Sequence, residues 1–192
     1  MAVYNASADA ANTGVRAFLT KIGEYYLGSS FNTGTGRGKK IWENIRDDIF
    51  NSQCAYCGKK DSKLQIEHLI MFNRVEYGLH HPGNIVPVCF ECNKRSKDNN
   101  NNYKTWTEHL EIVCRKKQND DDKIKERILK IENHINLGKY KYPVLNSEER
   151  KAMKIIANSL YESIKNEFDR AVKLFEDLDD AYIKKNNEST LK

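Results

Sequence analysis

Residues 54–58 read CAYCG and residues 89–93 read CFECN, so two Cys-x-x-Cys motifs stand 31 residues apart. Each motif can form a knuckle that offers two sulfur atoms to one metal ion, and two knuckles complete a tetrahedral set of thiolates. A redox dithiol would account for one such motif but not for a matched pair. Because four thiolates leave no open coordination position, we expect a structural zinc ion bound by Cys54, Cys57, Cys89 and Cys92. Cys114 stands apart and is expected to be a small core residue on a helix.

The segment between the knuckles contains a short apolar run, LQIEHLI at residues 64–70, that is typical of a buried strand. Glu67 and His68 lie in the middle of this run, although polar side chains in a buried strand cost free energy unless they are paired. Neighbouring residues of a strand point to opposite faces. The two side chains can therefore act on one substrate only if the strand bends or ends beside them.

From residue 52 to residue 102 the sequence resembles the HNH endonucleases of the ββα-metal nuclease superfamily. The shared parts are a first Cys-x-x-Cys-Gly, an acidic residue before a histidine, a loop, the sequence GNIVPVCFECN at residues 83–93, and a basic tail. The resemblance covers about a quarter of the chain. It implies a ββα-metal core held together by a zinc site, and phosphodiester hydrolysis that leaves a 3′-hydroxyl and a 5′-phosphate.

The resemblance also implies a role for four residues. His68 aligns with the histidine that acts as the general base, and Glu67 aligns with the acidic residue, usually Asp, that binds a catalytic Mg²⁺ or Mn²⁺. Asn84 aligns with the asparagine that braces the loop and helps to place the base, and Asn93 with the residue that completes the metal site. Ser96 stands where the family usually has a basic residue.

Each of these assignments has a structural alternative. His68 could be a hydrogen-bonded structural residue, and Glu67 could form a salt bridge with a nearby lysine. Asn93 could cap the helix that follows it. Asn84 could be a turn residue. The other four histidines are expected to be structural or solvent-facing, although His80 and His81, in the variable loop, could touch substrate. We expect His80 and His81 to pack within the loop or face solvent. His109 and His134 are expected to lie at the surface of helices.

The formal net charge of +5 is carried by the first three quarters of the chain. From residue 146 onward nine basic and ten acidic residues give a net charge of −1, which leaves +6 on residues 1–145. A basic surface suits a polyanionic partner, and we expect double-stranded DNA. We expect the GRGKK segment at residues 36–40 to be a loop, in which glycines would allow close approach to phosphate groups. The expected nucleic-acid contacts are Arg37, Lys39, Lys40, Lys94, Arg95 and Lys97.

Apolar periodicity predicts an α+β protein that is mostly helical, with N-terminal helices before the ββα-metal core and a helical region after it. The expected regions are 1–51, 52–102, 103–145 and 146–192. Expected helices cover residues 7–27, 41–50, 106–117, 121–137 and roughly 147–185. The long last helix carries an apolar stripe that we expect to pack on the rest of the protein, or else to form the surface for a homodimer or protein partner. The stripe comprises Ile156, Leu160, Ile164, Phe168, Val172, Phe175 and Leu178.

Composition points to a globular protein of the cytoplasm. Of the 192 residues 39% are apolar and 31% are charged, with no apolar run long enough to span a membrane. The N-terminus MAVYNASADA lacks the basic start and apolar core of a signal peptide.

The sequence therefore predicts a metal-dependent endonuclease, most simply of DNA, with a single-metal mechanism. A restriction enzyme, an antiphage effector or a mobile-element nuclease would fit. One alternative is a zinc-containing nucleic-acid-binding module that has lost catalysis. Another is an interaction scaffold that uses the C-terminal helix.

Overall fold

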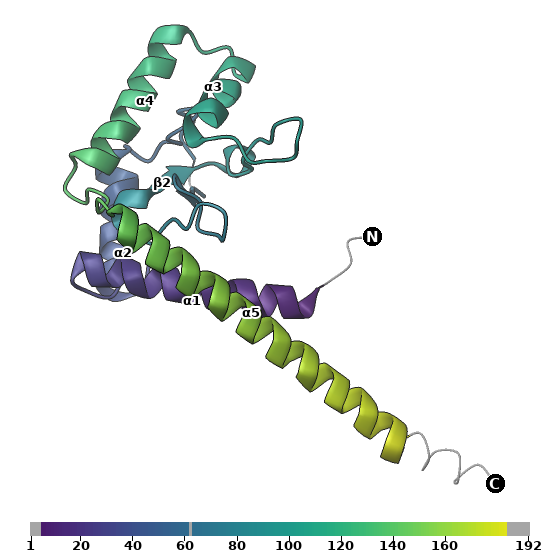
Figure 1. The fold of residues 1–192 in the computed structure, drawn as a ribbon. Helices are drawn as coiled ribbons and strands as arrows, with labels where there is room; N and C mark the ends of the chain where they lie inside the picture. The colour runs from purple at the N-terminus through teal and green to yellow at the C-terminus, as the bar shows by residue number, and fades with distance from the viewer. Residues whose placement is uncertain (1–4, 62, 184–192) are drawn as a thin grey trace. The chain divides into compact units, whose positions relative to one another are not determined.

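The computed structural model describes residues 5–61 and 63–183, which fall into two compact units. Within the described residues, one unit comprises 5–18 and 147–183, and the other comprises 19–61 and 63–146. Figure 1 shows the elements in chain order. They are α1 (Ala6–Leu27), α2 (Gly36–Glu43), β1 (Gln65–His68), β2 (Ile85–Val88), α3 (Trp106–Lys116), α4 (Asp121–Asn136) and α5 (Ser147–Leu178). Helices with one two-stranded sheet confirm the expected α+β class.

The sheet is an antiparallel hairpin between the two cysteine motifs. Glu67 pairs with Val86 and His68 pairs with Ile85, so β1 ends at the histidine. All four residues of β2 are buried, whereas β1 is partly exposed. On the other side of β2, the amide of Ala55 donates a hydrogen bond to the carbonyl of Pro87 at 2.7 Å. The first cysteine motif is thus bonded to the strand that leads into the second.

The apolar core of residues 19–146 surrounds this hairpin and the cysteines. Trp42 lies in the core, and Cys114 is fully buried with its thiol donating to the carbonyl of Tyr56 at 3.1 Å, which confirms the expected core role of this cysteine. Two histidines expected at the surface are buried instead. His109 Nε2 lies 2.9 Å from the carbonyl oxygen of Cys92, and His134 Nε2 lies 3.1 Å from that of Ile85. Both imidazoles satisfy backbone carbonyls that the short hairpin leaves without a partner, and helical spacing alone gives no sign of this.

Side chains cap the first turn of two helices in the unit of residues 19–146. Thr105 and Glu108 form a capping box at the start of α3, and Asp120 caps α4 by accepting from the amide of Lys123 at 2.8 Å. The GRGKK segment differs from the expected loop because it forms the first turns of α2. The amide of Lys39 donates to the carbonyl of Thr35 at 3.1 Å, and the buried Ile41 and Trp42 that follow hold this helix against the core.

The unit that contains α5 buries a different face of that helix from the expected stripe. Its buried residues are Met153, Ala157 and Tyr161. Leu160 and Ile164 are half-buried, but the other five stripe residues are exposed within the described chain. The expectation that the stripe packs on the rest of the protein therefore stays a prediction for these five, as does the expected dimer or partner surface. None of the described helices has the length and apolar character needed to cross a membrane.

Shortening a buried and an exposed side chain of α4 should show which face of the helix contributes to the free energy of unfolding. Ile131 is 0% exposed and Leu129 is 58% exposed on the same helix. We expect Ile131→Ala to lower the free energy of unfolding by about 2–5 kcal/mol, because it leaves a cavity. Leu129→Ala should change it by less than about 0.5 kcal/mol. Denaturant titration of both variants measures the difference, and equal losses would contradict this packing.

Candidate functional site

Four cysteine sulfur atoms converge at one end of the hairpin. Their Sγ atoms all lie within 4.8 Å of one another, and three of the four residues are buried. The amide of Gly58 donates to the carbonyl of Cys54 at 2.8 Å, and Gly58 has a φ of +74°, a conformation that glycine adopts at little cost. Cys92 likewise donates to Cys89 at 3.0 Å. This tetrad of buried, convergent thiols fits a structural zinc ion.

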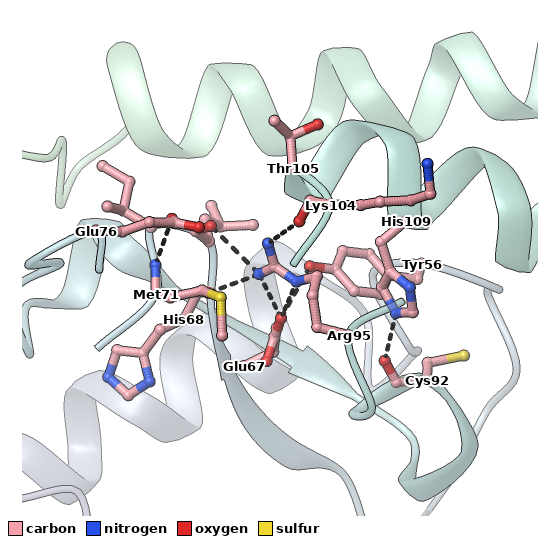
Figure 2. A network of polar contacts seen from close by, with 12 residues as sticks. Tyr56, Glu67, His68, Met71, Glu76, Cys92, Arg95, Lys104, Thr105 and His109 are labelled. Carbon is pink, nitrogen blue, oxygen red and sulfur yellow. Dashed lines mark hydrogen bonds and ion pairs between the residues drawn. The ribbon is translucent and has the colours of Figure 1, made fainter. Parts of the chain in front are cut away.

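The second cysteine motif is also tied to α3. His109, on α3, reaches Cys92 through Nε2, and its Nδ1 accepts from the amide of Ser96 at 3.1 Å. Figure 2 shows the bond between His109 and Cys92. The imidazole thus connects the metal-binding turn with the basic segment that follows it. Sequence reasoning missed this link because an isolated histidine on a helix gives no sign of its partners.

Glu67 takes part in a buried ion pair with Arg95 (Figure 2). Its Oε1 atom accepts from Nη2 of Arg95 at 2.5 Å, from Nε at 3.0 Å, and from the hydroxyl of Tyr56 at 3.4 Å. The side chains are 14% and 3% exposed. Burial raises the pKa of Glu67 although Arg95 and Tyr56 oppose the change. The salt bridge that the sequence allowed for Glu67 is thus present, with arginine in place of lysine.

Arg95 holds several segments together rather than facing solvent. Besides Glu67, its guanidinium donates to the carbonyl of His68 at 2.9 Å, of Leu69 at 3.3 Å and of Lys104 at 3.4 Å. These bonds join the end of β1 to the segment before α3. Arg95 therefore has a structural role, while it also lines the cleft described below, so the expected nucleic-acid contact stays a prediction.

Asn84 uses its whole amide to hold the loop between the strands. Its Oδ1 accepts from the amide of Ile70 at 2.8 Å, and its Nδ2 donates to the carbonyls of Ile70 and Leu79, both at 2.9 Å. Its own carbonyl accepts from the amide of Leu69 at 2.9 Å. The side chain is fully buried. It therefore ties both ends of the loop to β2, as the expected bracing role requires.

His68 projects away from Glu67. Its ring stacks on Phe72, with centroids 4.8 Å apart and an interplanar angle of 17°, and its Nε2 lies 3.0 Å from Nδ1 of His80. Burial, with a smaller effect of the neighbouring His80, lowers the pKa of His68 to about 3. The imidazole is therefore neutral near pH 7 and has a lone pair, but the burial that keeps it neutral also makes it a weaker base than a free imidazole.

Asn93 and Glu67 line a common cleft of about 1010 Å³ beside the second cysteine motif. Nδ2 of Asn93 donates to Oε1 of Gln65 at 2.7 Å. Neither Oδ1 of Asn93 nor Oε2 of Glu67 has a hydrogen-bond partner within residues 5–61 and 63–183. Two hard oxygen atoms are therefore open toward the cleft, and such atoms suit Mg²⁺ or Mn²⁺. His68 does not line this cleft, and neither does Asn84.

The cleft has a basic lining. Lys94, Lys97 and Lys116 line it without an ion pair to any described residue, whereas Lys117 is paired with Glu91 at 2.5 Å. Tyr103 adds a half-exposed aromatic ring under the ammonium group of Lys97, 4.7 Å from the ring centroid. The sequence indicates the basic run at 115–117 as near the motif but does not single out Lys116, and it gives no sign of Tyr103, because only the fold brings these residues to the cleft. The other expected contacts are exposed on α2, outside the cleft lining: Arg37, Lys39 and Lys40.

Comparison with known proteins gives one match. The model of the HNH endonuclease family matches residues 54–99, which include both cysteine motifs, the hairpin and most of the basic segment after it. This match confirms the resemblance noted in the sequence. No curated protein and no solved structure matches the chain.

Metal analysis should find about one zinc ion per chain in purified protein. Replacing Cys54 and Cys89 by Ser should remove the zinc together with cooperative unfolding, because the metal-binding free energy is part of the folding free energy. Cys114→Ala is the matched control, since Cys114 lies outside the tetrad and its loss should leave the zinc content unchanged. Folded wild-type protein without zinc would contradict the assignment.

The Glu67–Arg95 pair should contribute far more to stability than an exposed pair of equal length. We expect Arg95→Met to lower the free energy of unfolding by about 3–5 kcal/mol, because Glu67 is left buried without its partner. Lys117→Met removes a pair with the same 2.5 Å separation whose side chains are 46% and 55% exposed. It should cost less than about 1 kcal/mol. Chemical denaturation of the zinc-loaded proteins compares the two, and similar losses would contradict a structural role for Arg95.

Proposed function

Because residues 54–99 carry an HNH endonuclease domain, we propose that this protein is a metal-dependent endonuclease that hydrolyses phosphodiester bonds, with double-stranded DNA as its substrate. The observation that carries the proposal is the cleft beside the cysteine tetrad. It combines two unpaired oxygen atoms, on Glu67 and Asn93, with three lysines that make no ion pair in the described chain. Oxygen ligands suit a divalent ion and ammonium groups suit a phosphate backbone.

In this proposal Glu67 and Asn93 hold Mg²⁺ or Mn²⁺ through Oε2 and Oδ1. The ion would offset negative charge on the phosphate and on the leaving oxygen. Arg95 keeps the Glu67 carboxylate in one orientation, and Gln65 does the same for the Asn93 amide. Neither oxygen then needs to be repositioned when the substrate arrives.

His68 is the proposed general base. Its neutral imidazole takes a proton from the attacking water, as a positioned histidine does in many hydrolases. Side chains from opposite faces of a strand can share one phosphate only where the strand ends, and β1 ends at His68. The proposed scissile phosphate therefore lies at the end of β1. Asn84 fixes the loop that leaves β1 at this point.

The three unpaired lysines of the cleft are the proposed contacts to the phosphate backbone, with the exposed basic residues of α2 as additional contacts. Such contacts give affinity without reading bases, so they support nucleic acid as the partner and leave its sequence open. Roles in restriction or antiphage defence are proposals that rest on the HNH domain alone.

A non-catalytic nucleic-acid-binding module is the second candidate. Two contacts favour this candidate, because each gives a proposed catalytic side chain a partner within the protein. Glu67 is paired with Arg95, and His68 is bonded to His80. In that case the basic cleft would bind nucleic acid and the polar groups of the hairpin would serve only stability.

Plasmid nicking by the zinc-loaded protein with Mg²⁺ or Mn²⁺ tests the proposal. We expect wild-type protein to cut, and His68→Ala to lower the rate at least about 100-fold because the general base is lost. The melting temperature and zinc content of the variant serve as fold controls.

Three outcomes decide between the candidates. Equal cutting by wild type and His68→Ala would remove His68 from the mechanism. Salt-sensitive DNA binding without cutting would support the non-catalytic module. Cutting of RNA but not DNA, in a parallel assay, would change the proposed substrate.

A further inference from the structure

A second histidine from the loop between the strands lies against His68. Nδ1 of His80 is 3.0 Å from Nε2 of His68, within hydrogen-bond range. Phe72 contacts both rings, with centroids 4.8 Å from His68 and 5.7 Å from His80, and Phe31 packs on His80 with centroids 4.9 Å apart. Aromatic side chains thus enclose both imidazoles and set their orientation.

The backbone of His80 is fixed from several sides. A Cβ atom built on Gly23 of α1 would lie 2.3 Å from the carbonyl oxygen of His80, so α1 passes the loop too closely for any other residue. The preceding residue, Leu79, donates its amide to the hydroxyl of Tyr142 at 3.0 Å and accepts from Asn84 at 2.9 Å. His80 is therefore placed by the fold rather than by its contact with His68.

The short distance between the two nitrogen atoms restricts where the protons lie. Two lone pairs facing each other at 3.0 Å would repel, and two N–H groups would clash, so one ring donates and the other accepts. If His68 donates from Nε2, its Nδ1 keeps a lone pair. If His80 donates, His68 carries its proton on Nδ1 and has no lone pair left for catalysis.

A metal ion between the two rings would need further ligands. In the described part of the chain, the four cysteines are the one group of three or more His, Cys, Asp or Glu residues placed to share an ion. A hydrogen bond therefore accounts better for the pair than a bound metal does.

We propose that His80 is a positioning residue for His68, whose Nε2–H it accepts at Nδ1, so that Nδ1 of His68 is the atom that receives the proton. This inference rests on the proposed nuclease function. In the step, the proton leaves the attacking water for Nδ1 of His68, and the electron pair of the broken O–H bond stays on the hydroxide that attacks phosphorus. The resulting imidazolium keeps its Nε2–H bond to His80, so the ring stays in the same orientation during the step.

Nuclear magnetic resonance of the ¹⁵N-labelled, zinc-loaded full-length protein tests the pairing without an activity assay. Correlation of ring carbon-bound protons with ring nitrogens shows which nitrogen of each histidine carries the proton, and the His68→Ala spectrum assigns the signals. We expect the proton of His68 on Nε2 and an unprotonated Nδ1 on His80. A proton on Nδ1 of His68, or displacement of both sets of signals by one added equivalent of Zn²⁺, would overturn the proposal.

Two substitutions test the functional consequence. His80→Phe keeps an aromatic ring against Phe31 but removes the acceptor, whereas His80→Asn places an amide oxygen near the position of Nδ1. We expect His80→Phe to lower kcat for plasmid nicking roughly 10- to 100-fold with KM unchanged, and His80→Asn to restore most of the loss. Val75→Ala, at an exposed position of the same loop, is the control and should leave both constants unchanged.

The outcomes separate this inference from the proposed function. Equal losses in both His80 variants, or an effect on KM alone, would overturn the positioning role even if the wild type is an active nuclease. An inactive wild type would refute the nuclease function and with it the role of His68 as a base, while the spectrum would still report whether the hydrogen bond exists. If His80→Phe does not fold, the wild-type spectrum still tests the proposed hydrogen bond, because it shows which nitrogen of each histidine carries the proton.

Discussion

The convergence of four cysteine sulfurs is the constraint on which the rest of the domain depends. The strands are only four residues long, and a two-stranded hairpin of this size is at best marginally stable by itself. One cysteine motif is bonded to β2 through Ala55, and the other follows β2 directly. Closing the tetrad therefore fixes both ends of the polypeptide that carries the polar groups. Tyr56, inside the first motif, extends this order to Glu67 through its hydroxyl.

The polar groups of the hairpin form two separate arrangements on the two faces of β1. On one face, Arg95 neutralises Glu67 and binds three backbone carbonyls, which leaves one carboxylate oxygen for a ligand. On the other face, His68 is surrounded by aromatic rings and a second imidazole. A buried carboxylate next to a guanidinium attracts a cation less strongly than a free one does. In the proposed metal site, Glu67 would therefore be a rigidly held ligand that attracts the ion less strongly than a free carboxylate would.

The spacing inside each Cys-x-x-Cys motif made the metal tetrad predictable, although the two motifs lie 31 residues apart. The pairing of Glu67 with Arg95 could not be predicted in the same way. Lys94, Arg95 and Lys97 have similar charge in sequence, and only the path of the chain after the second cysteine motif buries one and exposes the others. His80 and His109 were missed for the same reason, since their partners lie 12 and 17 residues away. For the apolar stripe of α5, periodicity indicates that the helix has an apolar face but not which surface covers that face.

Pro87 has a consequence for how the hairpin meets other chains. A two-stranded sheet has two outer edges, and unpaired edges are where foreign strands add and aggregation begins. At the centre of β2 the outward carbonyl of Pro87 is already occupied by Ala55, and proline has no amide hydrogen to offer. A third strand would find neither donor nor acceptor at that position. The smallest sheet that can carry this polar site is thereby closed to extension along β2, which protects the domain against strand-mediated self-association.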